Sequence, residues 1–409
     1  MPKPRLLFLT LLAINRVEDR GIYNDLIREF IRHGHHVTIV SPVQRRERRP
    51  VGVTEGPGYR LIRFKTFNNQ KTSAPEKLLS LFSVDALFRR AVRRHVDAAS
   101  VDWCLYTTPP IMLTRTVAHV RRRYGARTYL LLKDIFPDNA ADLNLLKRGG
   151  RMYRHFRGVE RKLYALSDGI GCMSPANVRY VLDHNPEVPA TKVEVCPNAV
   201  DPLPVAPPAH RAEVRARYDI PDSAVVFFYG GNFGKPQMID FILEVLDHYR
   251  DHERVFFLLV GGGTEFGRLR AWYERTEPRA ARVLSSVPKE EFDQLIEAAD
   301  VGLVFLDRRF RIPNFPSRLL SYLENQLPVL CATDTASDMG PLAEENGFGF
   351  WCPSGDLPAF TTKMNEVLAL SDEARRAMGR TGRTYLENNY TTERAYEIIA
   401  ARLGKPIAT

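Results

Sequence analysis

The fold is decided by the stretch Val225-Val-Phe-Phe-Tyr-Gly-Gly-Asn-Phe-Gly-Lys235. Its continuous run of β-branched and aromatic residues is typical of a strand buried on both faces, as in a parallel sheet. The glycines that follow let the backbone turn sharply, and the periodicity of residues 238–246 predicts a helix just beyond them. Free amides, the helix dipole and the Lys235 ammonium would form a phosphate site there. An ordinary strand-to-helix turn with a solvated lysine is the alternative.

The composition indicates a globular protein of more than one domain. A chain of 409 residues favours two domains of roughly 200 residues each. The apolar run at residues 6–14 is too short for a membrane span and lacks a cleavage site, so we interpret it as a first strand. The cysteines are odd in number, lack metal-ligand spacing and have apolar neighbours, which favours reduced thiols in the cytoplasm. They are Cys104, Cys172, Cys196, Cys331 and Cys352.

The net charge of +10 calls for an anionic partner or another physical reason. Arginines cluster in the first half, at residues 45–49, 89–94 and 121–123. Nucleic acid and an anionic membrane surface are both candidate partners. Residues 78–96 form a basic amphipathic helix, which suits a membrane interface or a core-facing helix with a solvated basic face. No nucleic-acid-binding motif or interleaved aromatic platform accompanies the arginines, so we do not expect nucleic acid.

Two successive series of strands and helices run along the chain, which predicts an α/β fold of two doubly wound, Rossmann-like domains. The first series covers residues 1–200, and a stiff proline-rich linker follows at residues 201–212. The second covers residues 213–385. We expect a C-terminal helix at residues 386–409 to pack back on the first domain. Ligands of such sheets bind at the carboxyl ends of the strands, so we expect a cleft between the two domains.

Several short motifs occur in an order that resembles family 4 of the GT-B glycosyltransferases, across nearly the whole chain. The subgroup it resembles builds bacterial O-antigen, capsule or exopolysaccharide. In the second half the motifs are Tyr229-Gly-Gly-Asn-Phe-Gly-Lys235, Leu259-Val-Gly-Gly-Gly-Thr-Glu265, Val287-Pro-Lys-Glu-Glu291, Ala298-Ala-Asp-Val-Gly-Leu303, Phe315-Pro-Ser-Arg-Leu-Leu-Ser-Tyr-Leu323 and Leu327-Pro-Val-Leu330. In the first half they are Asp19-Arg-Gly-Ile-Tyr23, Thr108-Pro-Pro110, Lys133-Asp-Ile-Phe-Pro137 and Pro197-Asn-Ala-Val-Asp201.

The resemblance implies a donor site for a nucleotide-sugar in the second half. Lys235 would neutralise the charge that develops on the leaving diphosphate. Helix-start amides, the Ser317 hydroxyl and the Arg318 guanidinium would grip the phosphates; a structural ion pair is the alternative for Arg318. Glu265 would read the base or ribose, or serve as a carboxylate in the first turn of a helix. The expected donor-binding residues are Gly21, Gly230, Gly231, Asn232, Lys235, Glu265, Val287, Asn314, Pro316, Ser317, Arg318, Ser321 and Glu324.

The chain departs from the family at one pair of positions. The family has two glutamates with seven residues between them around this helix, where this sequence has Pro313 and Ser321. Ser321, or Glu324 one turn later, would then hold the ribose. Asn314 is a polar substitute for the glutamate that contacts the transferred sugar. The departure leaves the sugar and the usual catalytic assignment open.

In the first half the resemblance implies an acceptor site. Asp134 ends a predicted strand and would orient or deprotonate the acceptor hydroxyl; a turn or helix-capping aspartate is the alternative. Asp19, Arg20 and Pro109 would line the same site, and Gly21 would let the backbone approach the donor phosphates. The catalytic residues expected are therefore Lys235, Asp134 and Arg318.

The function implied is retaining transfer of a hexosyl or N-acetylhexosaminyl group, with UDP-sugar as donor. The acceptor would be a polyprenyl-diphosphate-linked sugar, and the protein would be cytoplasmic and peripheral to the inner membrane. No Asp-x-Asp string occurs, so we expect neither a metal nor another cofactor. One alternative is a nucleotide-sugar epimerase of the same fold. Another is an NAD-dependent oxidoreductase, although Gly261, Gly263 and Gly267 miss the dinucleotide-binding spacing by one residue.

Overall fold

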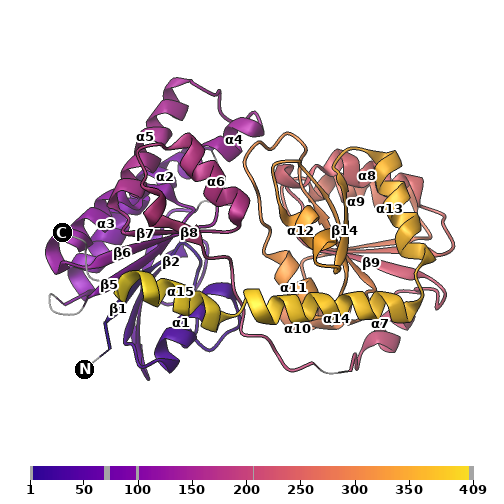
Figure 1. Ribbon diagram of the computed structural model, residues 1–409, viewed down its shortest axis with the longest axis horizontal. Helices are drawn as coiled ribbons and strands as arrows, with labels where there is room; N and C mark the ends of the chain where they lie inside the picture. Colours follow the sequence, from indigo (N-terminus) through magenta and orange to yellow (C-terminus); the bar gives the residue numbers. More distant parts are fainter. Residues whose placement is uncertain (1–2, 69–73, 98–100, 206, 405–409) are drawn as a thin grey trace. The chain divides into compact units, whose positions relative to one another are not determined.

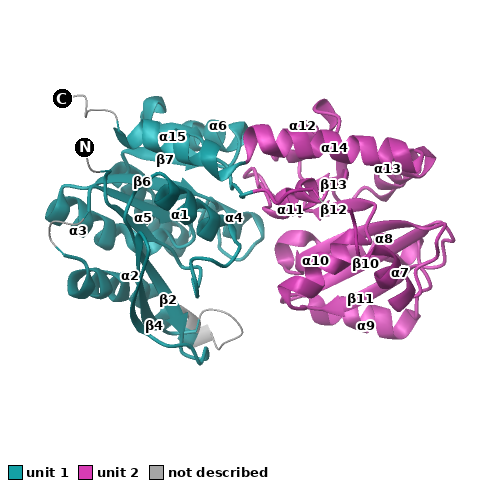
Figure 2. Ribbon diagram, turned by 90° about the horizontal axis from the view of Figure 1, so that it is seen from below, with its two compact units in different colours: residues 1–201, 391–409 teal, residues 202–390 magenta. Residues whose placement is uncertain are grey.

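The computed structural model describes residues 3–68, 74–97, 101–205 and 207–404. The chain divides into two compact units (Figure 2). Unit 1 comprises residues 1–201 and 391–409, and unit 2 comprises residues 202–390. The chain therefore passes between the units twice, after Asp201 and after Tyr390. Ala206 in the expected linker and residues 405–409 of the expected C-terminal helix lie outside the described residues.

Unit 1 is built on an eight-stranded sheet in the order β3-β4-β2-β1-β5-β6-β7-β8 (Figure 1). All neighbouring strands are parallel except β3 and β4. The central β1 is fully buried, and its Leu6 is paired with Val37 on one side and Trp103 on the other. The strands are β1 (Leu6–Leu9), β2 (Val37–Gln44), β3 (Gly52–Gly56), β4 (Tyr59–Thr66), β5 (Trp103–Thr107), β6 (Arg127–Leu132), β7 (Gly169–Cys172) and β8 (Val193–Val195).

Helices cover both faces of this sheet. On one face α1 and α15 share a core with β1, β2 and β4, and on the other α2, α3 and α5 contact one another. Phe64 of β4 meets Phe88 of α2 on that second face. The helices are α1 (Ile22–Arg32), α2 (Ala74–His95), η1 (Ile111–Leu113), α3 (Thr114–Tyr124), α4 (Asp138–Asp142), α5 (Arg151–Leu166), α6 (Pro175–His184), η2 (Ala190–Lys192) and α15 (Thr392–Gly404).

The last helix, α15, belongs to unit 1 although it ends the described chain. Tyr396 stacks on His33 and approaches Phe30 edge-on, with ring centroids 3.8 and 5.0 Å apart. His35 Nε2 and the Tyr396 hydroxyl lie 3.1 Å apart. Residues 386–389, which the sequence analysis grouped with this helix, instead end the preceding helix of unit 2, and α15 begins only at Thr392.

Unit 2 has a six-stranded, wholly parallel sheet in the order β11-β10-β9-β12-β13-β14. From β9 the chain adds strands on one side as far as β11 and then crosses to the other side for β12. The carboxyl ends of β9 and β12 therefore flank a topological switch point, where ligands of such sheets bind. The strands are β9 (Val225–Asn232), β10 (Val255–Gly262), β11 (Ala281–Ser285), β12 (Val301–Phe305), β13 (Val329–Thr333) and β14 (Gly349–Pro353).

Helices again cover both faces of the sheet. Phe227 and Tyr229 share a core with α8, α9 and α13, whereas Phe228 meets Phe292 of α10 and Tyr322 of α11 on the opposite face. The helices are α7 (Arg211–Arg217), η3 (Lys235–Gln237), α8 (Ile239–His248), α9 (Phe266–Thr276), α10 (Lys289–Glu297), α11 (Arg318–Glu324), α12 (Met339–Glu345), α13 (Leu357–Ala369) and α14 (Asp372–Asn389).

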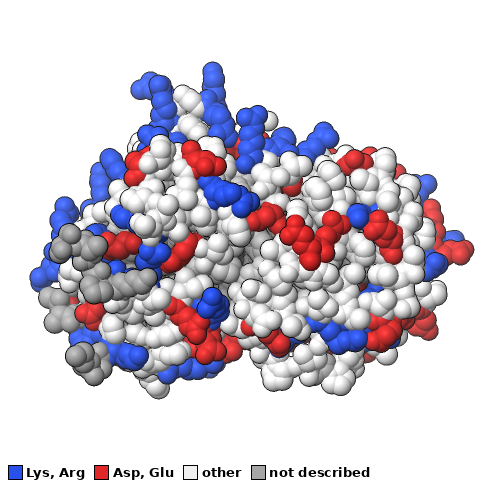
Figure 3. Space-filling view, viewed as in Figure 1, with Lys and Arg blue, Asp and Glu red and all other residues white. Residues whose placement is uncertain are grey.

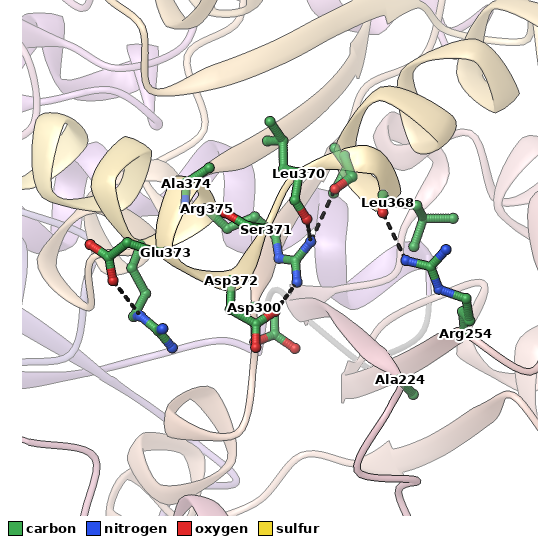
Figure 4. A network of polar contacts seen from close by, with 12 residues as sticks. Ala224, Arg254, Asp300, Leu368, Leu370, Ser371, Asp372, Glu373, Ala374 and Arg375 are labelled. Carbon is green, nitrogen blue, oxygen red and sulfur yellow. Dashed lines mark hydrogen bonds and ion pairs between the residues drawn. The ribbon is translucent and has the colours of Figure 1, made fainter.

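The long helix α14 is fixed to unit 2 by a buried arginine. Arg375 Nη1 donates to the Val367 and Leu370 carbonyls at 3.1 and 2.6 Å, and Arg375 pairs with Asp372 (Figure 4). These bonds join the start of α14 to the C-terminal end of α13, where helix carbonyls are short of backbone donors. The predicted class, two doubly wound α/β units, is confirmed in both units.

Candidate active site

A rigid loop follows β9 in unit 2. The Gln237 side-chain oxygen accepts bonds from the Gly234 amide and from Asn232 Nδ2, each 3.0 Å long. The Tyr229 hydroxyl donates to the Asn232 carbonyl at 2.7 Å. Lys235 follows directly and is exposed, and its ammonium has no polar partner among the described residues. The loop therefore presents a free cation from a fixed backbone.

Glycines let this loop touch the one after β10. A Cβ on Gly261, whose φ is +155°, would lie 1.8 Å from the Gly231 carbonyl oxygen. A Cβ on Gly263 would lie 2.3 Å from the carbonyl oxygen of Phe233. The Phe233 amide donates to the Gly262 carbonyl at 2.8 Å, which ties the two loops together. The glycines here serve the close packing of one backbone on another.

Arg318 lies over the same glycine loop. Its guanidinium carbon is 4.2 Å from the Tyr229 ring centroid, and its Nη2 lies 3.7 Å from where a Cβ on Gly231 would stand. Nη1 is buried and has no hydrogen-bond partner among the residues described. Burial alone would lower the pKa of Arg318, but the hydroxyls of Tyr229 and Tyr322 raise it above its ordinary value. The arginine therefore brings a charged, partly unsatisfied donor to the end of β9.

A buried carboxylate fixes the segment before α11. Asp334, just after β13, accepts bonds from the Ser337 amide and hydroxyl at 2.7 and 3.0 Å. The Ser337 hydroxyl oxygen accepts a hydrogen bond of 2.8 Å from the backbone amide of Asn314. Burial raises the pKa of Asp334 to about 6, and its hydrogen bonds oppose that rise. Sequence reasoning missed Asp334 and Ser337, because only the fold brings them beside Asn314.

Other predicted donor residues lie at the same edge or on α11. Glu265 precedes α9 and forms an ion pair of 3.4 Å with Arg268, while Val287 follows β11 and is half-buried. Glu324 Oε1 accepts the Leu203 amide at 3.0 Å, so this carboxylate also holds the segment that enters unit 2. Ser321 is half-buried on α11.

The start of α11 agrees with the sequence analysis. Arg318 is its first residue, as predicted. Pro316 is half-buried and Ser317 is exposed, and the Ser317 side chain makes no capping bond. Its hydroxyl is therefore not committed to closing the helix.

In unit 1, Asp134 follows β6. Thr108 Oγ1 accepts the amides of Lys133 and Asp134 at 3.0 and 3.4 Å, so β5 fixes the backbone here. Asn139 Nδ2 lies 2.7 Å from both carboxylate oxygens of Asp134. Burial raises the pKa of Asp134 to about 6, and the Asn139 bonds act in the opposite direction. The carboxylate is thus a proton acceptor at neutral pH.

Two polar groups near the carboxyl edge of this sheet were missed. Lys133 Nζ donates to the Cys196 carbonyl at 3.1 Å, and burial lowers the pKa of this lysine to about 8. Asn198 is also buried, and its Oδ1 has no hydrogen-bond partner in the described structure. Their positions in the motifs at residues 133–137 and 197–201 were the sequence signal that could have identified both.

The remaining predicted acceptor residues are held mainly through the backbone. The Asp19 carbonyl accepts Arg28 Nη1 at 2.8 Å, and Arg20 Nη2 donates to the Asp201 carbonyl at 3.1 Å. The Gly21 amide donates to Asp25 Oδ1 at 3.1 Å with an extended φ of 164°, which any residue can adopt. Pro109 is exposed after β5.

The described residues contain neither a metal-binding cluster nor a membrane-spanning helix. No group of three or more His, Cys, Asp and Glu side chains there is arranged to hold a metal ion. No helix in the described part of the chain is long and apolar enough to cross a membrane.

Each half of the chain matches a family model. Residues 22–199 match the glycosyl transferase 4-like domain, and residues 210–385 match glycosyl transferases group 1. The chain is a GT-B glycosyltransferase of family 4. In this glycosyltransferase, the model of the second half covers the β9 loop, Lys235 and Arg318, and the model of the first half covers Asp134.

Two relatives of this glycosyltransferase share 24% identity with it. The probable glycosyltransferase WbjE of Pseudomonas aeruginosa aligns over 373 residues, 89% of this chain and 88% of WbjE. The putative colanic acid biosynthesis glycosyl transferase WcaI of Escherichia coli K12 aligns over 287 residues, 67% of this chain and 68% of WcaI.

Solved structures share the GT-B fold at lower identity. Sucrose-phosphate synthase from Thermosynechococcus elongatus superposes with a TM-score of 0.73 at 15% identity, covering 98% of both chains. Anabaena Alr3699/HepE in complex with UDP and glucose gives 0.68 at 14%, covering 99% of this chain and all of HepE (100%).

Proposed function

We propose that this glycosyltransferase moves a hexosyl or N-acetylhexosaminyl group from a UDP-sugar to a lipid-linked acceptor, with retention of anomeric configuration, in bacterial surface polysaccharide synthesis. The observation that carries the donor side is the buried, unpartnered Nη1 of Arg318 beside the glycine loop of β9. A buried cationic donor without a partner costs free energy, which an anionic ligand recovers. The relative WcaI is named for colanic acid biosynthesis, and the structural neighbour HepE was solved in complex with UDP and glucose.

On the donor side, the reaction is accelerated by stabilising the negative charge of the leaving group. As the glycosidic bond breaks, negative charge develops on the leaving UDP. Lys235 is exposed and has no polar partner among the described residues, so it neutralises that charge without first breaking an ion pair. Arg318, held against Tyr229 by a cation–π contact, binds the diphosphate through Nη1. Asn314, positioned through Ser337, contacts the sugar in place of the family's glutamate.

On the acceptor side, Asp134 orients the acceptor hydroxyl and takes its proton. A carboxylate with a pKa of about 6 is largely ionised at neutral pH yet more basic than an ordinary aspartate. The acceptor is a sugar on a polyprenyl diphosphate, and the protein works on the cytoplasmic face of the inner membrane. The positive charge of the chain favours an anionic leaflet. No metal takes part, since Lys235 and Arg318 supply the positive charge on the diphosphate.

The function is tested by offering UDP-, GDP- and dTDP-sugars side by side, with thermal shift for binding and release of nucleoside diphosphate for turnover. We expect stabilisation by UDP and UDP-sugars, and turnover that depends on a lipid-diphosphate acceptor. Stabilisation by NAD, without a response to any nucleotide-sugar, would overturn the proposal. Conversion of a UDP-sugar into its epimer, without an acceptor and without net release of UDP, would indicate the epimerase alternative.

A further inference from the structure

An exposed segment between α4 and α5 combines apolar and cationic side chains. Leu145 and Met152 are 54% and 43% exposed. Lys147, Arg151 and Arg154 are exposed beside them in the sequence, and none forms an ion pair or side-chain hydrogen bond within the described chain. We call residues 144–155 the α4–α5 segment. In the space-filling view, Lys and Arg side chains protrude over this part of unit 1 (Figure 3).

Apolar side chains of α2 extend this surface. Leu79 and Phe82, three residues apart on that helix, are 50% and 48% exposed. The Phe82 ring centroid lies 6.4 Å from that of His155 on α5, one helical turn beyond Met152. Large apolar side chains from two separate elements are therefore left uncovered next to one another, as at interaction surfaces.

Carboxylates beneath the segment do not cancel its charge. Asp138 and Asp142 are buried, and Arg148 binds each of them through a contact of 2.6 Å. The Tyr153 hydroxyl also donates to Asp138 at 2.7 Å. One arginine and one tyrosine thus satisfy these acids, and Lys147, Arg151 and Arg154 remain available to an outside anion.

The surface lies at the same edge of the sheet as Asp134. Phe136, two residues after Asp134, packs edge-on against Phe156 of α5, with ring centroids 5.0 Å apart. At the other end of α5, the Leu166 carbonyl accepts the Thr128 hydroxyl, near the start of β6. The first turn of α5 is therefore at the carboxyl edge, where the acceptor hydroxyl is proposed to bind.

The larger arginine cluster of unit 1, on α2, differs from the α4–α5 segment because it lacks large exposed apolar side chains among the residues described. Ala86, Arg89, Arg90, Arg93 and Arg94 of α2 line an open hollow of about 350 Å³. This end of α2 lies at the opposite edge, because Asp97 beyond it pairs with Arg60 at the start of β4 at 3.5 Å. No large exposed apolar side chain of the described residues lies on this half of the helix. It offers charge without an apolar surface.

We propose that the α4–α5 segment, with Leu79 and Phe82, is the surface through which this protein docks on an anionic lipid bilayer. Leu145, Met152 and the two α2 side chains enter the boundary between headgroups and acyl chains, and the three free cations bind lipid phosphates. The inference deepens the proposed function, since a lipid-linked acceptor is presented at such a surface.

The test is flotation of the full chain with vesicles of phosphatidylcholine alone or mixed equally with phosphatidylglycerol. We expect binding to the mixed vesicles only. Arg151→Glu/Arg154→Glu should weaken it about tenfold or more, and Leu145→Ser/Met152→Ser, which changes no charge, should also weaken it clearly. The matched control Arg90→Glu/Arg94→Glu alters the net charge equally at the hollow and should retain binding. Circular dichroism and thermal melting confirm that each variant is folded.

Equal loss in the Arg90→Glu/Arg94→Glu control would overturn the inference, because binding would then follow net charge alone. Full binding by both segment variants would overturn the inference as well. Absence of vesicle binding by the unaltered protein would also overturn it and would indicate that this surface binds a protein partner instead. Transfer to a water-soluble acceptor should be unchanged in Arg151→Glu/Arg154→Glu. If the unaltered protein transfers no sugar yet binds vesicles, the proposed function fails and the docking surface stands.

Discussion

The Asn139 side-chain amide bridges both carboxylate oxygens of Asp134, with its Nδ2 2.7 Å from each. Asn139 is itself fixed, because it lies on α4 between Asp138 and Asp142, and Arg148 binds both of those acids. Burial pushes the pKa of Asp134 up to about 6, and the two bonds from Asn139 limit that rise. The basicity of the proposed general base therefore comes from burial and is limited by a neighbouring amide.

Replacing Asn139 by leucine should move the pH dependence of transfer. Without the two donors the ionised form of Asp134 loses stabilisation, so its pKa rises above about 6. The acidic limb of the kcat–pH profile should shift to higher pH, which steady-state kinetics with a saturating donor measures. Asn185→Leu is the control, because it also removes a buried side-chain amide, but one that donates to the Val181 carbonyl and not to Asp134. This control should lower the melting temperature and leave the acidic limb of the kcat–pH profile unchanged.

Asp134→Asn should abolish transfer and stabilise the fold above pH 6. The folded pKa of about 6 exceeds the ordinary 3.8, so the native state holds a proton that the unfolded chain releases. The free energy of unfolding therefore falls as pH rises between these values, and asparagine avoids that loss. We expect a gain of about 3 kcal/mol well above pH 6, and none below pH 3.8. Denaturant unfolding at both extremes checks this; a gain independent of pH would contradict it.

Gly261→Ala should destabilise unit 2 and disrupt the donor site. The new Cβ would stand 1.8 Å from the Gly231 carbonyl oxygen, so backbone must move. We expect a loss of about 2 kcal/mol or more and weaker UDP binding by calorimetry. Gly267→Ala is the matched control, since nothing lies within 4 Å of its Cβ position. Because Gly267 is inside α9, that change should stabilise the fold by about 0.5–1 kcal/mol.

Lys235→Ala should lower kcat by about 10²–10³-fold, the effect of removing one preorganised group that stabilises the transition state. The melting temperature should not change, because Lys235 is exposed and has no polar partner among the described residues. Lys363→Ala, which removes a lysine paired with Glu344 at 3.1 Å, is the control for loss of one positive charge. Near-normal turnover by Lys235→Ala would remove this residue from the mechanism.

Chelation should leave transfer unchanged. The positive charge on the diphosphate is assigned to Lys235 and Arg318, so dialysis against EDTA should alter neither kcat nor KM. The measurement is the transfer rate before and after dialysis, with Mg²⁺ or Mn²⁺ added back in parallel. A loss that the metal restores would assign the diphosphate contact to a cation.

The sequence predicted the structure best where a single run of residues determines one strand or helix. The apolar run before Gly230 is β9, and the helix expected near Arg318 is α11. β3 was missed, because its residues, Gly-Val-Thr-Glu-Gly, are exposed and do not alternate between apolar and polar. Asp334 and Asn139 were also missed. Their importance arises from partners that only the fold or the exact side-chain geometry supplies, and neither spacing nor composition reports a hydrogen bond.

Because α15 completes unit 1, the first unit depends on residues that follow the whole of unit 2 in the chain. All of unit 2 has been synthesised before Tyr396 can cover Phe30 and His33. The nascent first half therefore has an exposed apolar face until α15 has been synthesised. A premature stop codon after Tyr390 would retain every strand of the described structure and still remove that cover. Such nonsense mutations should therefore yield aggregation-prone protein rather than a shorter working enzyme.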